Sequence, residues 1–132
     1  MKNCYPIVIS RGTQYFVVDI PDFTISTQGK DIAEAMEMAR DAIGLMGIHL
    51  EDEGMAIPQP SPIGAIRKED DADIVTLVDV DFSEYRRMND SRVVKKNCTL
   101  PSWLNFAAEK AGVNFSAILQ DALKRELRIT EA

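Results

Sequence analysis

The chain has 132 residues, 45% hydrophobic and 27% charged, with a formal net charge of −6, which suits one compact domain, or a modest domain with a small appendix. No apolar run approaches the roughly 18 residues that a membrane-spanning helix needs, and the N-terminus lacks the apolar core, about 7–15 residues long, of a secretory signal peptide. We therefore expect a cytoplasmic protein without a membrane partner, in which Cys4 and Cys98 are reduced thiols.

Charge is distributed unevenly along the chain. Residues 1–90 contain 8 Lys/Arg and 17 Asp/Glu (8 − 17 = −9), whereas residues 91–132 contain 7 Lys/Arg and 4 Asp/Glu (7 − 4 = +3). An acidic surface repels nucleic acid and a basic surface attracts phosphate. The split predicts two domains with different partners: an acidic domain over 1–81, a flexible connection over 82–92 and a basic domain over 93–132.

The acidic domain begins with strand patterns. Residues 5–10 and 14–20 are rich in Ile, Val and aromatic residues and flank a turn at 11–13, which predicts a hairpin. Pro21 breaks the second strand, and a third is expected over 23–27.

A long helix is predicted over residues 31–52, with Asp31 at its start and Gly54 just beyond its end. Apolar residues at spacings of three and four place one stripe on this helix: Ile32, Met36, Ala39, Ile43, Met46 and Leu50. Residues 74–80 then alternate as a last strand. The order β-β-β-α-β predicts a mostly antiparallel sheet of three or four strands with one helix packed across it.

Candidate catalytic groups in the acidic domain are few. Asp19, Asp79 and Asp81 are carboxylates that could bind a divalent metal, but they lie at strand ends, where exposure to solvent explains them. The only histidine, His49, lies near the acidic end of the long helix and has no catalytic partner in the sequence. We expect no catalytic residue, metal site or cofactor, and a domain that binds a partner. A two-metal nuclease is the enzymatic alternative.

The basic domain opens with alternating side chains over residues 93–100. Three polar side chains share one face of this predicted strand: Lys95, Asn97 and Thr99. The other face carries Val94, Lys96, Cys98 and Leu100. Lysine contacts guanine or phosphate, asparagine contacts adenine and threonine contacts either base, so the three polar residues are the predicted base-reading set. A solvent-exposed edge strand is the structural alternative.

Two short helices follow this strand. Pro101 suits the first turn of one helix, Gly112 its end, and Asn114 the N-cap of the next. The amides of Asn114, Phe115 and Ser116 lie at a helix N-terminus and are predicted phosphate contacts.

One strand and two short helices are too small to bury a core alone. Two copies wound together would form a ribbon-helix-helix dimer, whose paired strands enter the major groove of operator DNA. The predicted dimer core is Val94, Cys98, Leu100, Leu104, Ile118, Leu119 and Ala122.

Several motifs occur in a recognisable order. They are the aromatic-rich strand 15–20, Pro21-Asp22, Gln28-Gly29, the helix segment 33–39, the strand 77–81 and the tail segment 98–116. This combination resembles the HicB antitoxin family, in the branch with a ribbon-helix-helix C-terminus. The resemblance implies an α+β antitoxin of a type II toxin–antitoxin pair. Its N-terminal domain would be a partial RNase H-like fold without nuclease activity that neutralises a HicA-like mRNA-cleaving toxin, and its C-terminal β-α-α domain would repress its own operon.

Two features depart from that family pattern. Phe23-Thr24-Ile25 replaces the common Pro-Gly turn, and Lys96 occupies an inward strand position that is usually apolar. The alternative function is a stand-alone transcription regulator with a ligand-sensing N-terminal domain. A homodimer is expected, and a tetramer through the N-terminal domains is left open.

Overall fold

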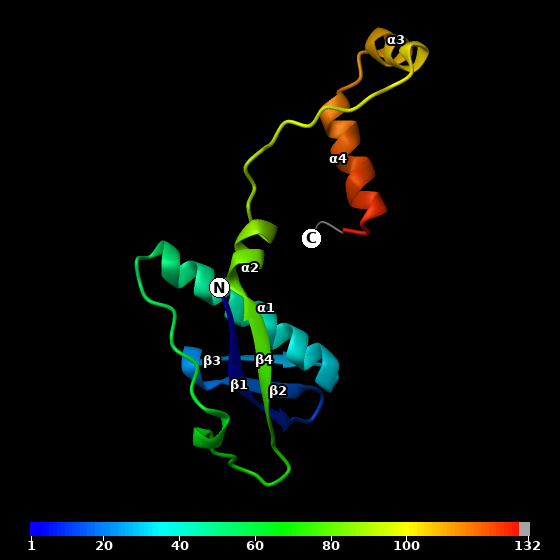
Figure 1. Cartoon of the computed structure of the whole chain (residues 1–132). Helices are drawn as coiled ribbons and strands as arrows, with labels where there is room; N and C mark the ends of the chain where they lie inside the picture. Colours follow the sequence, from blue (N-terminus) through cyan, green and yellow to red (C-terminus); the bar gives the residue numbers. More distant parts are fainter. Residues whose placement is uncertain (130–132) are drawn as a thin grey trace. The chain divides into compact units, whose positions relative to one another are not determined.

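The fold, taken from a computed structural model, is described for residues 1–129 and divides into two compact units, Met1–Arg92 and a second that starts at Val93 (Figure 1). The start of the second unit lies at the first residue of the predicted basic domain. Residues 130–132 of that domain lie outside the described part.

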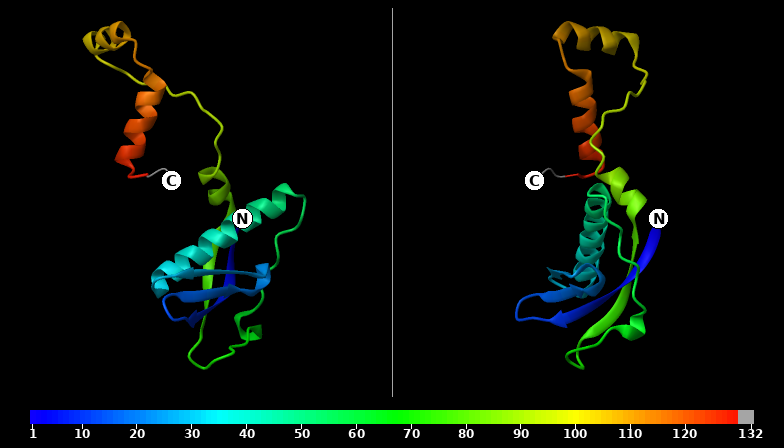
Figure 2. Two further views of the ribbon diagram at one scale, coloured as in Figure 1. Left: turned by 180° about the vertical axis from the view of Figure 1, so that it is seen from behind. Right: turned by 90° about the vertical axis from the view of Figure 1, so that its left-hand side faces the viewer.

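The first unit is built on a four-stranded antiparallel sheet. Its strands are β1 (Lys2–Arg11), β2 (Phe16–Ile20), β3 (Ile25–Gly29) and β4 (Ile74–Asp81), in the spatial order β3-β2-β1-β4. β1 pairs with β2 through its second half and with β4 through most of its length, and Figure 2 shows β1 and β4 running side by side. The predicted β-β-β-α-β order and the antiparallel sheet are confirmed.

The third strand begins two residues later than predicted. Pro21–Phe23 form a 3₁₀ turn (η1), and Thr24 then adopts φ 54° and ψ 42°, with its N–H donating to the Pro21 carbonyl. This left-handed conformation costs a residue with a Cβ about 1–2 kcal/mol. The replacement of the Pro-Gly turn by Phe23-Thr24 therefore leaves a β-branched residue where glycine would fit freely.

Helix α1 (Ile32–Asp52) packs across one face of the sheet. The Asp31 carboxylate accepts the Glu34 N–H at 2.7 Å as an N-cap, and Gly54 follows the C-cap with φ 74°. The predicted stripe packs on the core except for Ile32 in the first turn, which is exposed. The core residues buried between helix and sheet are Tyr5, Ile7, Ile9, Val18, Ile20, Ala35, Ala39, Ile43, Val78 and Val80.

Tyr5 joins four parts of this unit. Its ring makes edge contacts with Phe23 at 4.9 Å and Phe82 at 6.2 Å between centroids. Its hydroxyl donates to the Pro58 carbonyl at 2.8 Å, and burial raises the pKa of this hydroxyl. The proline-rich connection after α1 is therefore held against the core.

Residues 82–88 form a packed helix where a flexible connection was expected. Helix α2 (Phe82–Met88) starts at Asp81, whose carboxylate accepts the N–H groups of Ser83 and Glu84. Phe82 is 3% exposed. Of the predicted connection 82–92, only residues 89–92 lie between α2 and the second unit.

Two glycines of α1 explain why α2 packs closely. A Cβ built on Gly47 would lie 2.2 Å from the Phe82 ring, and one on Gly44 would lie 2.5 Å from the Tyr85 ring. Arg86 of α2 also pairs with Glu51 and Asp52 of α1, at 3.2 and 3.1 Å. The sequence did not predict this contact, because it depends on which glycines of α1 face the aromatic rings of α2.

The second unit contains two helices, α3 (Ser102–Ala111) and α4 (Phe115–Glu126). Gly112 ends α3 with φ 70°, and the Asn114 side chain caps α4 by accepting the Ala117 N–H, as predicted. The strand predicted over residues 93–100 is not formed in the single chain, where this segment has no regular hydrogen bonding. A strand needs a neighbouring strand to bond with, and this unit contains none among its described residues.

The replacement Gly47→Ala tests the contact between α1 and α2. Overpacking costs about 1–3 kcal/mol, and alanine returns up to about 1 kcal/mol of helix propensity. Because the added Cβ overlaps the Phe82 ring, we expect the upper part of this range, a net loss of about 1–2 kcal/mol in the free energy of unfolding, measured by urea denaturation. Gly64→Ala is the control, because nothing lies within 4 Å of its added Cβ. Unchanged stability of the Gly47 variant would contradict the close packing.

Candidate dimerisation and nucleic-acid interface

The second unit has no core of its own. None of the residues 93–129 is buried, although a typical core residue is almost fully shielded. Its large exposed apolar side chains range from 39% exposed at Leu104 to 92% at Val93. They are Val93, Val94, Leu100, Trp103, Leu104, Phe106, Phe115, Ile118, Leu119, Leu123, Leu127 and Ile129. Contiguous exposed apolar surface on this scale is typical of an interface.

Part of this surface forms a groove between the extended segment, α3 and α4, with a volume of about 800 Å³. Six of the seven residues predicted for the dimer core line it: Cys98, Leu100, Leu104, Ile118, Leu119 and Ala122. Val94 does not line the groove and is 87% exposed. The structure therefore brings together the residues predicted for the dimer core, except Val94.

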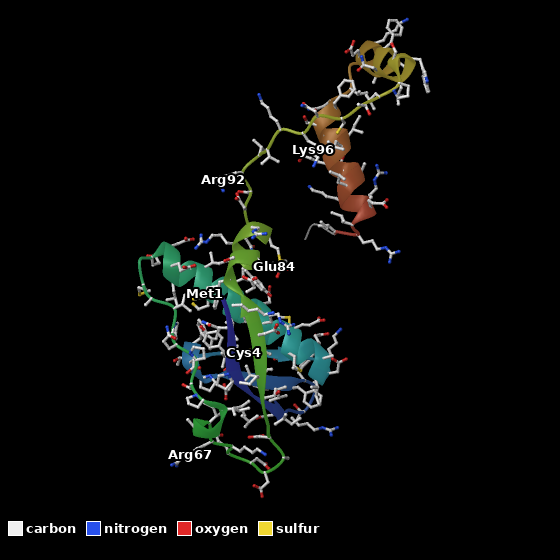
Figure 3. All side chains as sticks on the ribbon, viewed as in Figure 1. Met1, Cys4, Arg67, Glu84, Arg92 and Lys96 are labelled. Carbon is white, nitrogen blue, oxygen red and sulfur yellow. The ribbon has the colours of Figure 1, made fainter. Side chains whose placement is uncertain are left out.

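The extended segment separates its two sets of side chains as the alternation predicts. Lys96, Cys98 and Leu100 line the groove, whereas Lys95, Asn97 and Thr99 do not and are exposed. Figure 3 marks Lys96 on this segment. Its alkyl stem can cover apolar surface while the ammonium reaches water, and the acidic Glu109 lines the same groove. An inward lysine is therefore compatible with the predicted register.

The start of α4 presents backbone donors. The first N–H groups of a helix have no acceptor within the helix, and here the Asn114 side chain takes the Ala117 N–H at 3.0 Å. Phe115 and Ser116 occupy the first two helical positions and are exposed. The cap uses the side-chain oxygen of Asn114 and not its backbone N–H, so the phosphate contact predicted for the amides of Asn114, Phe115 and Ser116 stays a prediction.

The strand carboxylates of the first unit have structural partners. Asp19 accepts the Ser26 hydroxyl at 2.6 Å, Asp79 pairs with Arg40 at 3.1 Å and Lys2 at 3.4 Å, and Asp81 caps α2. The Arg40 guanidinium, followed by Lys2, holds the pKa of Asp79 below its ordinary value. Within residues 1–129 no group of three or more His, Cys, Asp or Glu side chains is placed to hold a metal ion. The geometry gives the nuclease alternative no support.

Cys4 and Cys98 are free and exposed. No helix in the described part of the chain is long and apolar enough to cross a bilayer.

A family model described as "HicB_like antitoxin of bacterial toxin-antitoxin system" matches residues 5–121, which include the sheet, α1, α2 and most of the second unit. The chain belongs to the HicB-like antitoxin family. Its role is that of a non-enzymatic regulatory protein, in agreement with the sequence-based expectation. A comparison with curated proteins gave no match.

Solved structures of toxin–antitoxin proteins resemble this HicB-like antitoxin. A chain of the "Toxin-Antitoxin complex from Streptococcus pneumoniae" is 28% identical with a TM-score of 0.59, covering 96% of this chain and 99% of that one. The Burkholderia pseudomallei antitoxin HicB is 20% identical with a TM-score of 0.54, covering 97% and 98%. A chain of the "HicA3 and HicB3 toxin-antitoxin complex" is 22% identical with a TM-score of 0.52, covering 60% and 99%. The last two likenesses concern the fold alone.

The replacement Leu104→Glu tests whether the groove is a dimer interface. A carboxylate buried there without a partner costs several kcal/mol, so we expect the dimer dissociation constant to rise about 100-fold or more. Sedimentation equilibrium measures it. Phe106→Glu is the matched control, because Phe106 lies on the same helix, outside the groove and 66% exposed. Equal weakening by both variants would argue against the groove.

Proposed function

We propose that this HicB-like antitoxin represses its own operon as a ribbon-helix-helix homodimer. The supporting observation is a 40-residue C-terminal segment with no buried residue in its described part and an apolar groove along one face. A second copy covers the groove in this proposal, and the segments 93–100 of the two chains pair as an antiparallel ribbon. Lys95, Asn97 and Thr99 of both chains then read bases in the major groove, while the start of α4 contacts phosphate.

The double variant Lys95→Ala/Asn97→Ala tests the base contacts. Each good base contact contributes about 1–3 kcal/mol, and the dimer would lose two from each chain. We expect specific retardation of operator DNA to weaken about 100-fold or more in a gel-shift titration at fixed salt. Lys110→Ala is the control, because it removes one positive charge from an exposed position outside the groove. Normal binding by the double variant would contradict the assigned residues.

We also propose that the first unit neutralises a HicA-like mRNA-cleaving toxin by direct binding. Support comes from the family and from similar chains in complexes described as toxin–antitoxin complexes. The charge of residues 1–90, 8 − 17 = −9, complements a basic protein that binds RNA. Both partners, toxin and operator, would be met in the cytoplasm.

Co-purification tests this role. We expect the tagged full-length antitoxin to retain the product of a neighbouring open reading frame that encodes a small basic protein. That product should cleave RNA alone and lose this activity at equimolar antitoxin. An adjacent basic protein that neither binds nor is inhibited would contradict the proposal.

A stand-alone regulator with a sensing domain is the second candidate. A cavity of about 550 Å³ lies between the first hairpin and the segment that follows η2 (Ile63–Ala65), lined among others by Asp19, Arg67 and Asp73. This volume suits a small ligand. The candidate predicts operator binding that depends on a small molecule and no toxin gene beside the antitoxin gene.

The partial RNase H-like relationship of the first unit remains part of the proposal. The structural roles of Asp19, Asp79 and Asp81 are consistent with such a domain being used for binding rather than for nuclease chemistry.

A further inference from the structure

Strand β4 lies at one edge of the sheet, and β1 is its only neighbouring strand among the described residues. The hydrogen-bonding phase of this pair follows from two observations. Phe82 N–H donates to the Met1 carbonyl at 3.0 Å, and Leu77 faces Pro6, which has no N–H to give. In an antiparallel ladder, hydrogen-bonded and non-hydrogen-bonded residue pairs alternate. Phe82 is in a hydrogen-bonded pair and Leu77 in a non-hydrogen-bonded one, so Thr76 and Val78 bond to β1.

The residues that alternate with Thr76 and Val78 along β4 direct their backbone N–H and C=O groups away from β1. These are Val75, Leu77 and Asp79, and the only partner recorded for these outward groups within residues 1–129 is Arg40, whose Nε donates to the Asp79 carbonyl at 2.9 Å. Arg40 thus closes one end of the edge. The outward N–H and C=O groups of Val75 and Leu77 remain available to another strand.

Side chains along this edge are apolar in the middle, and exposed carboxylates precede its start. Leu77 is 44% exposed and Ile74 40%. Residues 69–81 contain six acidic side chains and no Lys or Arg: Glu69, Asp70, Asp71, Asp73, Asp79 and Asp81. In the described structure Asp79 is paired with Lys2 and Arg40, Asp81 with the N-terminal ammonium, and Asp73 is buried. The carboxylates of Glu69, Asp70 and Asp71 are exposed and have no ion pair among the described residues.

The charge distribution favours one kind of occupant. A second copy would bring no unpaired cation from the end of its β4, because Lys2, Arg40 and the N-terminal ammonium are already paired with Asp79 and Asp81. A strand carrying Lys or Arg at the end that meets the start of β4 would complement the unpaired carboxylates there.

We propose that the free edge of β4 receives a strand of the basic toxin, which extends the antitoxin sheet through main-chain hydrogen bonds to Val75 and Leu77. This inference rests on the proposed toxin-neutralising function and adds the surface and the mode of binding. Leu77 supplies apolar contact beside the added strand, and the exposed carboxylates of Glu69, Asp70 and Asp71 pair with its cations.

Amide hydrogen exchange of the full-length antitoxin, free and with the purified product of the neighbouring reading frame, tests the mode of binding. The Val75 and Leu77 amides are expected to exchange fast in the free protein and at least about tenfold more slowly in the complex. The Thr76 and Val78 amides, bonded to β1, are internal controls protected in both states. A complex that leaves Val75 and Leu77 unprotected overturns the proposal, and so does protection in the free antitoxin that grows with its concentration.

Variants of the edge give a second readout. Leu77→Pro removes an outward donor without touching the ladder to β1, and Leu77→Lys places a cation on the edge in case the proline variant does not fold. Either is expected to weaken toxin binding about tenfold or more. Leu45→Lys is the matched control, since Leu45 of α1 is 43% exposed and remote in sequence from the edge.

The possible outcomes distinguish failure of the β4 edge proposal from failure of the proposed antitoxin function. Wild-type affinity of the Leu77→Lys variant, or equal weakening by Leu77→Lys and Leu45→Lys, overturns the edge proposal while the antitoxin function stands. Failure of the wild-type protein to bind the neighbouring product removes the proposed function and the edge proposal with it.

Discussion

The absence of any buried side chain among residues 93–129 constrains the whole protein. Gly112 ends α3 and Asn114 caps α4, and part of the apolar surface of both helices lines one groove, which no other described residue of this unit covers. Short helices gain most of their stability from packing, so this segment requires another surface in order to be stable. In the proposed dimer the same association would create both the core and the polar ribbon that reads DNA.

The first unit, in contrast, completes its own core. Tyr5, Phe23 and Phe82 bring β1, η1 and α2 together, and glycines on α1 let aromatic rings approach its backbone. This self-sufficient unit leaves its acidic groups mostly at the surface, and β3 and β4 are the edge strands of its sheet in the described part of the chain. The face under α1 stabilises the fold, and the β4 edge is the surface that we propose for a partner.

Local chemistry explains which elements were predictable. Alternating Ile and Val predicted β1, β2 and β4, and the caps Asp31, Gly112 and Asn114 predicted helix ends to within a residue or two, because each acts on its own neighbours. The late start of β3 was missed because Thr24 adopts a conformation unusual for a β-branched residue. Helix α2 was taken for a connection because the surface on which it packs, at Gly44 and Gly47, lies more than thirty residues earlier in the sequence.

The sequence by itself determined the β-β-β-α-β order of the first unit, the two helices of the second, the charge split and the two sets of side chains on residues 93–100, since all of these depend on neighbours along the chain. Only the tertiary structure decided which partners the strand carboxylates bind, how α2 packs on α1 and which backbone groups of β4 point away from β1. Those depend on contacts between residues far apart in sequence and on the phase of one strand pair, set here by Pro6 opposite Leu77.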